Sequence, residues 1–223
     1  MKEMSYSVLI TGGSRGIGKA TCELFRLKGY NVTAPNRDEL ELSDKESVKK
    51  YIESHPEGFD IIINNAGINE IHEVGELDEM DLEKMMSINL ISPYMLINGF
   101  IKRMAEKKFG RIVNIASIWS VVSKPGRSVY SSTKRGLHGL TTTLAMEYGK
   151  FNVLSNTISP GFTLTDLTRK NNTPEQIEAI SSTIPVQRMA EVDEIARAVY
   201  FVGSPENTYI NGQNIVVDGG YSL

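Results

Sequence analysis

The stretch Thr11-Gly12-Gly13-Ser14-Arg15-Gly16-Ile17-Gly18 decides the fold of this chain. It follows the short apolar run Ser7–Ile10 directly and opens a segment of helical period that extends to about Lys28. A turn with so few side chains lets backbone N–H groups and the positive end of the helix dipole approach a phosphate. The order of strand, glycine turn and helix therefore predicts an anion-binding unit at the start of the chain.

Three other interpretations of this turn compete with that prediction. Gly13 to Lys19 matches a P-loop up to its lysine, but Ala20 stands where a Ser or Thr must hold magnesium. Ser14 is the centre of a G-x-S-x-G pattern typical of serine hydrolases, but only one strand precedes it and His138 is the last histidine. A purely structural glycine turn is the third alternative.

Short apolar runs alternate with helical segments along the rest of the chain, which is typical of βαβ units. We therefore expect an α/β fold with a doubly wound, mainly parallel, seven-stranded sheet and helices on both faces, built as one domain over residues 1–223. The expected strands are Ser7–Ile10, Asn31–Ala34, Leu40–Leu42, Asp60–Asn64, Arg111–Ile115, Asn152–Ser159 and Asn214–Asp218.

The region after the second expected strand is shortened. Too few residues separate Val32 from Leu40 for a helical crossover, which usually needs about 10–12. A turn should replace the helix there. Further along, capping-box patterns predict helix starts at Ser43 with Glu46 and at Thr173 with Gln176.

Composition excludes several classes of function. The net charge is −3, with 24 Lys and Arg interspersed among 27 Asp and Glu, so neither nucleic acid nor a membrane surface is an expected partner. Cys22 is the one cysteine, which excludes an internal disulfide and a multi-cysteine zinc site, and no metal site is expected. The N-terminus lacks the apolar core of a signal peptide, so we expect a cytoplasmic protein.

Four polar residues are candidates for chemistry. Tyr130 and Lys134 are four apart, so on a helix they share a face, and the ammonium should lower the tyrosine pKa from about 10. Ser117 follows a strand-like run, where its hydroxyl can hydrogen-bond a substrate oxygen. Asn89 lies in an apolar helical segment, where a buried hydrogen-bonding role is expected.

These motifs, with Asn64-Asn65-Ala66-Gly67 and the ending Val217-Asp218-Gly219-Gly220, resemble the short-chain dehydrogenase/reductase family over essentially the whole chain. The resemblance implies a Rossmann-like fold and hydride transfer between a nicotinamide and a carbonyl carbon. It also implies that Tyr130 protonates the oxygen, Ser117 polarises it, Lys134 assists Tyr130 and Asn89 supports a water relay. The implied cofactor contacts are Thr11, Gly12, Ser14, Arg15, Gly16, Ile17, Gly18, Asn36, Arg37, Glu41, Leu42, Asn65, Ala66, Gly67, Tyr130, Lys134, Pro160, Gly161, Thr163 and Thr165.

The charges near the second strand favour NADP(H) over NAD(H). Asn36 stands where an acidic residue would bind the ribose hydroxyls, Arg37 follows it, and Arg15 adds a second cation that can pair with a 2′-phosphate. Glu41 departs from the Asp or Asn usual beside adenine, and the shortened segment weakens the placement of Arg37.

The substrate should contact Ser117, Trp119, Tyr130 and Phe162 under a lid of about residues 162–189. The first hypothesis is a 3-oxoacyl thioester, free or bound to an acidic carrier protein that Lys107 and Lys108 would meet. A sugar-nucleotide or other polar keto compound is the alternative, and a non-catalytic NADP-binding regulator is the alternative of another class. Family members usually form homotetramers or dimers, so a homo-oligomer is expected.

Overall fold

The computed structural model describes residues 6–223, and the part of the N-terminus at residues 1–5 on which the absence of a signal peptide was argued lies outside it. The central sheet has six parallel strands in the order β2-β1-β3-β4-β5-β8. These are β1 Ser7–Ile10, β2 Asn31–Thr33, β3 Ile61–Asn64, β4 Gly110–Ile115, β5 Val153–Pro160 and β8 Asn214–Val217. The doubly wound parallel sheet is therefore confirmed.

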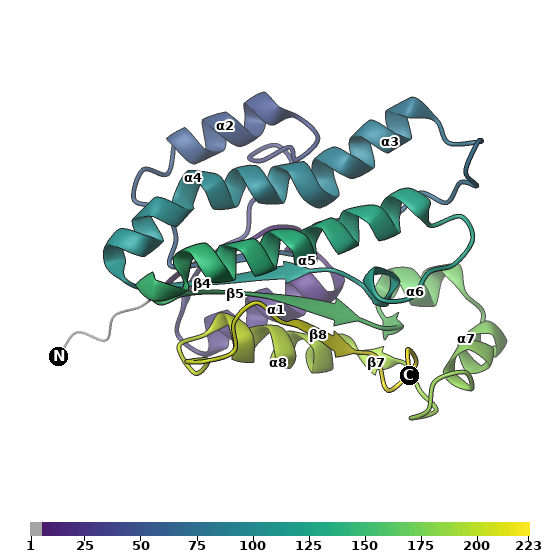
Figure 1. The fold of residues 1–223 in the computed structure, drawn as a ribbon. Helices are drawn as coiled ribbons and strands as arrows, with labels where there is room; N and C mark the ends of the chain where they lie inside the picture. The colour runs from purple at the N-terminus through teal and green to yellow at the C-terminus, as the bar shows by residue number, and fades with distance from the viewer. Residues whose placement is uncertain (1–5) are drawn as a thin grey trace.

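Helices cover both faces of this sheet (Figure 1). On one face α1 (Gly16–Leu27) and α8 (Val192–Gly203) bury Phe25 and Val199 against Val8 and Ile63. On the other face lie α2 (Lys45–Glu53), α3 (Glu79–Met86), α4 (Ser92–Lys107) and α5 (Ser128–Tyr148). Leu9 and Ile62 point to this second face, because successive side chains of a strand alternate between its two sides.

The prediction of seven strands is wrong at Leu40–Leu42. The segment forms turns, because Leu40 N–H donates to the Asn36 carbonyl and Asp44 N–H to the Glu41 carbonyl, at 3.0 and 3.1 Å. Both leucine side chains are nevertheless buried in the core, so the apolar pattern reported burial and not a strand. The strand β2 is left as the edge of the sheet, with a turn in place of the missing crossover helix, as expected.

One of the two predicted capping boxes is confirmed. Thr173 caps α7 (Pro174–Ser181) reciprocally with Gln176. The other is wrong by one residue, since the Asp44 side chain accepts from Glu46 N–H and so begins α2, while Ser43 donates its hydroxyl to Glu41.

The segment after β5 leaves the sheet and returns to it. It contains β6 (Thr163–Leu164), α6 (Asp166–Asn171), α7 and β7 (Ala190–Glu191). The two short strands pair in parallel, with Thr163 opposite Ala190. This pairing closes the base of the excursion, and Arg188 fixes its end through two hydrogen bonds to Glu194 of α8, at 2.6 and 2.7 Å. Residues 162–189 thus form a compact flap beside the carboxyl ends of the strands (Figure 1).

Candidate active site

The turns after β1 and β3 are bound together at the carboxyl edge of the sheet. The Thr11 hydroxyl accepts hydrogen bonds from the N–H groups of Asn65 and Ala66, both at 3.1 Å. The Asn65 side chain returns two bonds, to the carbonyls of Thr11 and Gly12, at 3.0 and 3.1 Å. Two stretches more than fifty residues apart in sequence therefore form one rigid wall, where ligands of open α/β sheets usually bind.

The glycine turn has the geometry of a phosphate cradle. Gly12 and Gly16 have φ of +68° and +54°, and a Cβ at Gly18 would lie 2.2 Å from the Gly12 oxygen. Arg15 precedes α1 without a side-chain cap, and the first turn of this helix carries no acidic residue. The first N–H groups of α1 are therefore left to an outside anion, and the residues present fit the phosphates of a dinucleotide.

The turn after β2 holds the residues on which the NADP(H) prediction rests. The Asn36 side-chain oxygen accepts the N–H groups of Asp38 and Glu39, at 2.8 and 3.1 Å, so it caps the turn. Arg37 and Arg15 are both exposed, and neither has an ion-pair partner within the described residues. The Glu41 carboxylate is held by Ser43, whose N–H and hydroxyl bonds lower the pKa of Glu41.

Tyr130 lies in the first turn of α5, beside Ser117 from the end of β4. Ser117 is buried, and its side chain lies close enough to Tyr130 to act on the pKa of the tyrosine. Lys134 follows one turn later on the same face, with its Nζ 5.6 Å from the centre of the Tyr130 ring. This ammonium donates to the Ile115 carbonyl at 2.8 Å. The structure therefore brings together three of the four residues singled out for chemistry.

The expected direction of the tyrosine pKa is wrong for the protein chain alone. Burial raises the pKa of Tyr130, and the Ser117 side chain and the positive charge of Arg127 offset the rise only in part. Burial also lowers the pKa of Lys134, to about 8, so its ammonium is a weaker source of positive charge than an exposed lysine. Desolvation, which residue spacing does not report, is the largest effect on the pKa of both groups.

Asn89 occupies a π-helical turn, Ser87–Ile91, between α3 and α4. It is fully buried and exchanges two 2.9 Å hydrogen bonds with the backbone of Ile68. A third bond, at 3.3 Å, joins it to Thr133, the neighbour of Lys134. A Cβ at Gly67 would lie 3.2 Å from Lys134 Nζ and 3.3 Å from Asn89 Oδ1, so this glycine lets Asn89 and Lys134 approach the same space. The predicted buried hydrogen-bonding role of Asn89 is confirmed.

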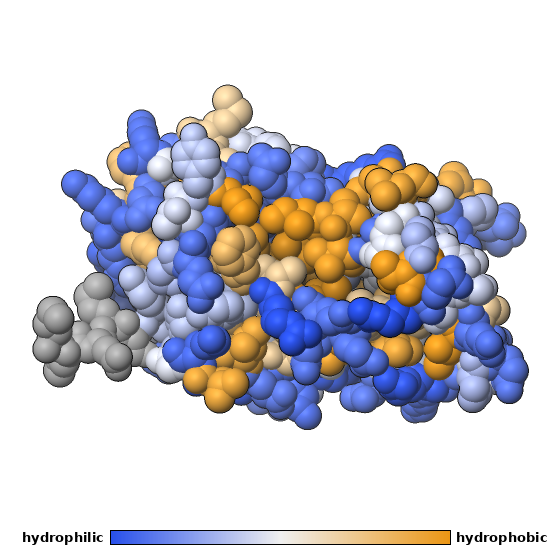
Figure 2. All heavy atoms as spheres, turned by 90° about the horizontal axis from the view of Figure 1, so that it is seen from below, coloured by the Kyte–Doolittle hydropathy of each residue, from blue (hydrophilic) through white to orange (hydrophobic). Residues whose placement is uncertain are grey.

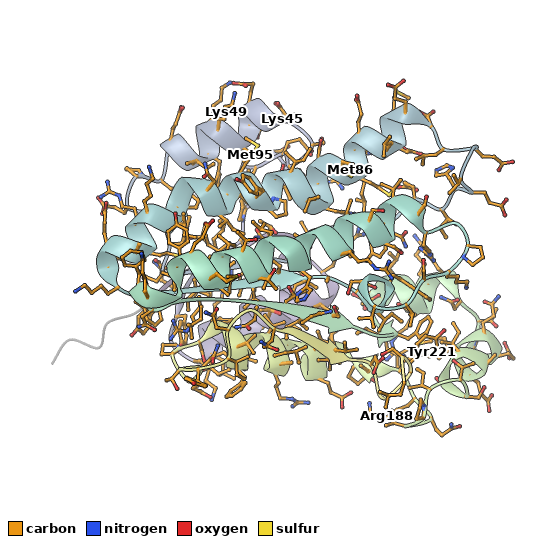
Figure 3. All side chains as sticks on the ribbon, viewed as in Figure 1. Lys45, Lys49, Met86, Met95, Arg188 and Tyr221 are labelled. Carbon is orange, nitrogen blue, oxygen red and sulfur yellow. The ribbon has the colours of Figure 1, made fainter. Side chains whose placement is uncertain are left out.

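Aromatic side chains border the flap beside the site. Trp119 and Phe162 meet edge to face with 6.3 Å between ring centres, and Phe162 meets Tyr221 in the same way at 5.1 Å. Tyr221 was not among the residues predicted for the site, although Gly219 and Gly220 before it are typical of a turn. Asp218 forms that turn by accepting the N–H groups of Gly220 and Ser222, both at 2.8 Å. Figure 3 shows Tyr221 at the end of the molecule that carries α6 and α7.

The flap also reaches the glycine turn. A Cβ at Gly16 would lie 3.3 Å from the Thr165 methyl group, so the start of the flap and the start of α1 are neighbours. Thr163 donates to the Gly161 carbonyl at 3.1 Å, which orders the chain between Pro160 and Thr165. The residues predicted for the nicotinamide end thus lie beside those predicted for the phosphates.

Lys107 and Lys108 lie at the wrong end of the sheet to meet a carrier docked at the site. They end α4 just before β4 begins, whereas Ser117 follows the other end of β4 (Figure 1). Lys107 is also engaged in an ion pair with Asp60 at 2.9 Å. Two adjacent lysines in a sequence do not indicate near which end of a strand their side chains will lie.

Neither a metal centre nor a membrane span is found in residues 6–223. No group of three or more His, Cys, Asp or Glu is arranged to hold a metal ion in this part of the chain. No helix in the same range is both long and apolar enough to cross a membrane.

Comparisons with known proteins agree over nearly the full length. A family model described as Enoyl-(Acyl carrier protein) reductase matches residues 39–222. The 3-oxoacyl-(acyl-carrier-protein) reductase FabG of Vibrio cholerae serotype O1 is 33% identical, over 95% of this chain and 95% of that protein. The solved structure of 4-hydroxyisoleucine dehydrogenase complexed with NADH has a TM-score of 0.91 and 31% identity, covering 97% of this chain and 98% of that one. That of ElxO with NADP bound has a TM-score of 0.91 and 29% identity, covering 98% and 99%.

The family model covers more than half of this chain, and the relative at 33% identity covers 95% of it. We conclude that the chain belongs to the short-chain dehydrogenase/reductase family, whose members are oxidoreductases of CH–OH groups that use a nicotinamide cofactor.

Proposed function

We propose that this protein is an NADP(H)-dependent reductase that converts the 3-oxo group of an acyl thioester to a secondary alcohol, with Tyr130 as the proton donor. The observation that carries the reaction type is the convergence of Tyr130, Ser117 and Lys134 at the carboxyl edge of the sheet. The likeness to a 3-oxoacyl-(acyl-carrier-protein) reductase over 95% of both chains supports the substrate class.

Each residue of the site has a separate role in the proposed reduction. Tyr130 donates its hydroxyl proton to the carbonyl oxygen, and Ser117 holds that oxygen by a hydrogen bond. Lys134 stabilises the tyrosinate that is left, and Asn89 with Thr133 orders the polar path behind it. A bound reduced nicotinamide supplies the hydride that the carbonyl carbon receives, so one hydride and one proton together give the alcohol. General acid catalysis of this kind contributes about 10²–10⁴-fold to the rate.

The flap and the glycine turn form the binding part of the site. Gly12, Gly16 and the start of α1 would hold the phosphates, and Asn65 to Gly67 would border the adenosine side. Arg15 and Arg37 support NADP(H), because both are exposed and unpaired and can meet a 2′-phosphate. Titration with NADPH and NADH, followed by nicotinamide fluorescence, should give much tighter binding of NADPH. Equal binding would contradict this preference.

The substrate class is tested by following NADPH oxidation with a 3-oxobutanoyl thioester of N-acetylcysteamine. Thioester-dependent oxidation is expected. Tight NADPH binding with no turnover of thioesters, sugar-nucleotide ketones or simple ketones would instead favour a cofactor-binding regulator. Turnover of the sugar-nucleotide ketone alone would move the substrate assignment to the polar alternative.

The proposal includes a homo-oligomer, a dimer or tetramer, in the cytoplasm. The strand β8 ends the sheet with one free edge, and its side chains are only half-buried. Figure 2 shows apolar side chains gathered on the underside of the molecule, the side on which α8 and β8 lie in Figure 1. A second copy that covers this surface would remove it from water. Sedimentation at the monomer mass would contradict the oligomer.

A further inference from the structure

The turn that begins at Ser117 is bound to α5 by an arginine that the proposed mechanism does not use. This Ser117 turn (residues 117–121) contains the short 3₁₀ helix Ile118–Ser120, which Val121 ends. Arg135 of α5 donates from Nε to the Ser120 carbonyl at 3.0 Å and from Nη2 to the Val121 carbonyl at 3.2 Å. One guanidinium therefore binds two consecutive peptide groups at the end of the turn.

These two carbonyls are acceptors that the hydrogen bonds within the turn do not use. The Ile118 carbonyl accepts the N–H groups of Val121 and Val122, at 2.8 and 3.0 Å. The last carbonyls of a helix lack partners of this kind, and basic side chains can supply them. Arg135 forms no ion pair with a carboxylate of residues 6–223, so no salt bridge draws its guanidinium away from the turn.

Hydrogen bonds within the same turn hold both the backbone and the hydroxyl of Ser117. Ser120 N–H donates to the Ser117 carbonyl at 2.8 Å, and Trp119 N–H donates to Ser117 Oγ at 3.3 Å. A second contact joins the turn to the sheet, because Ser120 Oγ lies 3.0 Å from the Oγ of Ser159 near the end of β5. The Ser117 turn therefore has two anchors, Arg135 on α5 and Ser159 on β5.

The anchor on α5 is the one that connects Ser117 with the helix of Tyr130. Arg135 follows Lys134 directly, so its side chain leaves the helix about 100° further round than that of Lys134. Tyr130 and Lys134 face the site, and Arg135 lies on the flank of α5 that the Ser117 turn reaches. The two bonds of Arg135 thus join the two elements that supply the reacting hydroxyl groups.

We infer that Arg135 is a positioning residue, which fixes the Ser117 hydroxyl relative to Tyr130 by binding the Ser117 turn to α5. Groups that act on a substrate must be held in their productive geometry by the residues around them. The planar guanidinium presents Nε and Nη2 side by side, whereas a lysine ammonium has no such fork. The inference rests on the proposed function, because it takes Ser117 as the group that holds the substrate oxygen.

Trp119 reports directly on the Ser117 turn, because it lies within the turn and is the one tryptophan of the chain. Its ring is half-buried and meets Phe162 edge to face. In Arg135→Gln the anisotropy of Trp119 fluorescence should fall and its quenching by acrylamide should rise, with Arg135→Lys in between. Arg103→Gln on α4 is the control and should change neither, because this exposed arginine binds Glu106 on its own helix. Anisotropy and quenching equal to those of the wild type in Arg135→Gln would overturn the inference.

Turnover of the 3-oxobutanoyl thioester separates positioning of Ser117 from a general structural role. Arg135→Gln should lower kcat by about 10-fold, short of the roughly 100-fold that a 1 Å misplacement can cost. Its affinity for NADPH should stay within about threefold of the wild type, because both bonds of Arg135 go to the turn. In a Ser117→Ala background no hydroxyl is left to position, so Arg135→Gln should then lower the residual kcat by less than about threefold. Equal losses in the two backgrounds would overturn the inference.

Failure of the proposed function gives a different result from failure of the inference. Absence of turnover with every carbonyl compound would overturn the proposed function, while the fluorescence of Trp119 would still decide whether Arg135 holds the Ser117 turn. Full turnover by Ser117→Ala would overturn the role of Ser117 and, with it, the positioning role of Arg135.

Discussion

Replacement of Asn114 by alanine should destabilise the protein strongly, because this side chain links the three central strands below the active site. Asn114 accepts a hydrogen bond from Asn64 of β3 at 2.8 Å and donates one to Thr141 of α5 at 2.9 Å. Thr141 in turn accepts from Thr157 of β5, at 2.9 Å. All four residues are buried, and β3, β4 and β5 hold Asn64, Asn114 and Thr157 in direct register.

The magnitude follows from what the alanine leaves behind. Two buried hydrogen bonds are lost, each worth about 1 kcal/mol net. The amide of Asn64 then has no partner at either end, since its Oδ1 is already unpaired, and a buried unsatisfied group costs about 1–3 kcal/mol. A small cavity adds to this. We therefore expect Asn114→Ala to lower the free energy of unfolding by about 3–5 kcal/mol.

Urea unfolding followed by circular dichroism measures this loss, with Asn98→Ala on the exposed side of α4 as the matched control. The control should change stability by less than about 0.5 kcal/mol. The double variant Asn64→Ala/Asn114→Ala should lose less than the sum of the two single changes, because the second change removes the stranded amide. A loss below about 1 kcal/mol in Asn114→Ala, or strict additivity in the double variant, would refute the argument from buried polar pairing.

Two further predictions concern the glycine turn and the buried lysine. Gly18→Ala should weaken cofactor binding and cost about 1–3 kcal/mol of stability, because its Cβ would lie 2.2 Å from the Gly12 oxygen, whereas Gly139→Ala on α5 has open space and should not destabilise. Titration and thermal unfolding of both variants check this, and equal behaviour would be inconsistent with a crowded turn. Lys134→Met should abolish turnover yet raise stability by about 1–3 kcal/mol at pH 7, because burial lowers the pKa of Lys134 to about 8. Between that value and the ordinary value of 10.5 the unfolded state binds more protons than the folded state, so the stability of the wild-type protein should rise with pH in this window. If the stability of Lys134→Met rose with pH as steeply as that of the wild type, the assignment would be refuted.

The parts of the fold that depend on local pattern were predictable from sequence. The turn requires glycine at Gly12 and Gly16 because their φ is positive, and at Gly18 because a Cβ would collide with the Gly12 oxygen. These requirements are local and do not depend on the rest of the fold. Most of the predicted strands lie within a residue or two of the observed ones, because buried parallel strands need continuous apolar runs. Spacing on a helix was likewise enough to place Tyr130 and Lys134 on one face.

The predictions that were wrong depend on tertiary contacts, which the periodicity of the sequence does not report. Leu40 and Leu42 are buried like strand residues, but the Leu40 N–H donates within a local turn and the Leu42 carbonyl accepts from the Ser92 hydroxyl. The direction of the Tyr130 pKa depends on how much water the folded site excludes, and no spacing rule gives that.

Turnover by Tyr130→Phe tests the central claim most directly. The change removes the hydroxyl and keeps the ring, so cofactor binding and the fold should persist. With saturating NADPH and a 3-oxobutanoyl thioester, the variant should lose about 10²–10⁴-fold in kcat, as expected when a general acid is removed. Cofactor affinity should stay within about threefold of the wild type, because no hydrogen bond worth even about 1 kcal/mol is removed from the cofactor's phosphates. A variant that binds NADPH normally and retains full turnover would contradict the assignment of Tyr130 as the proton donor.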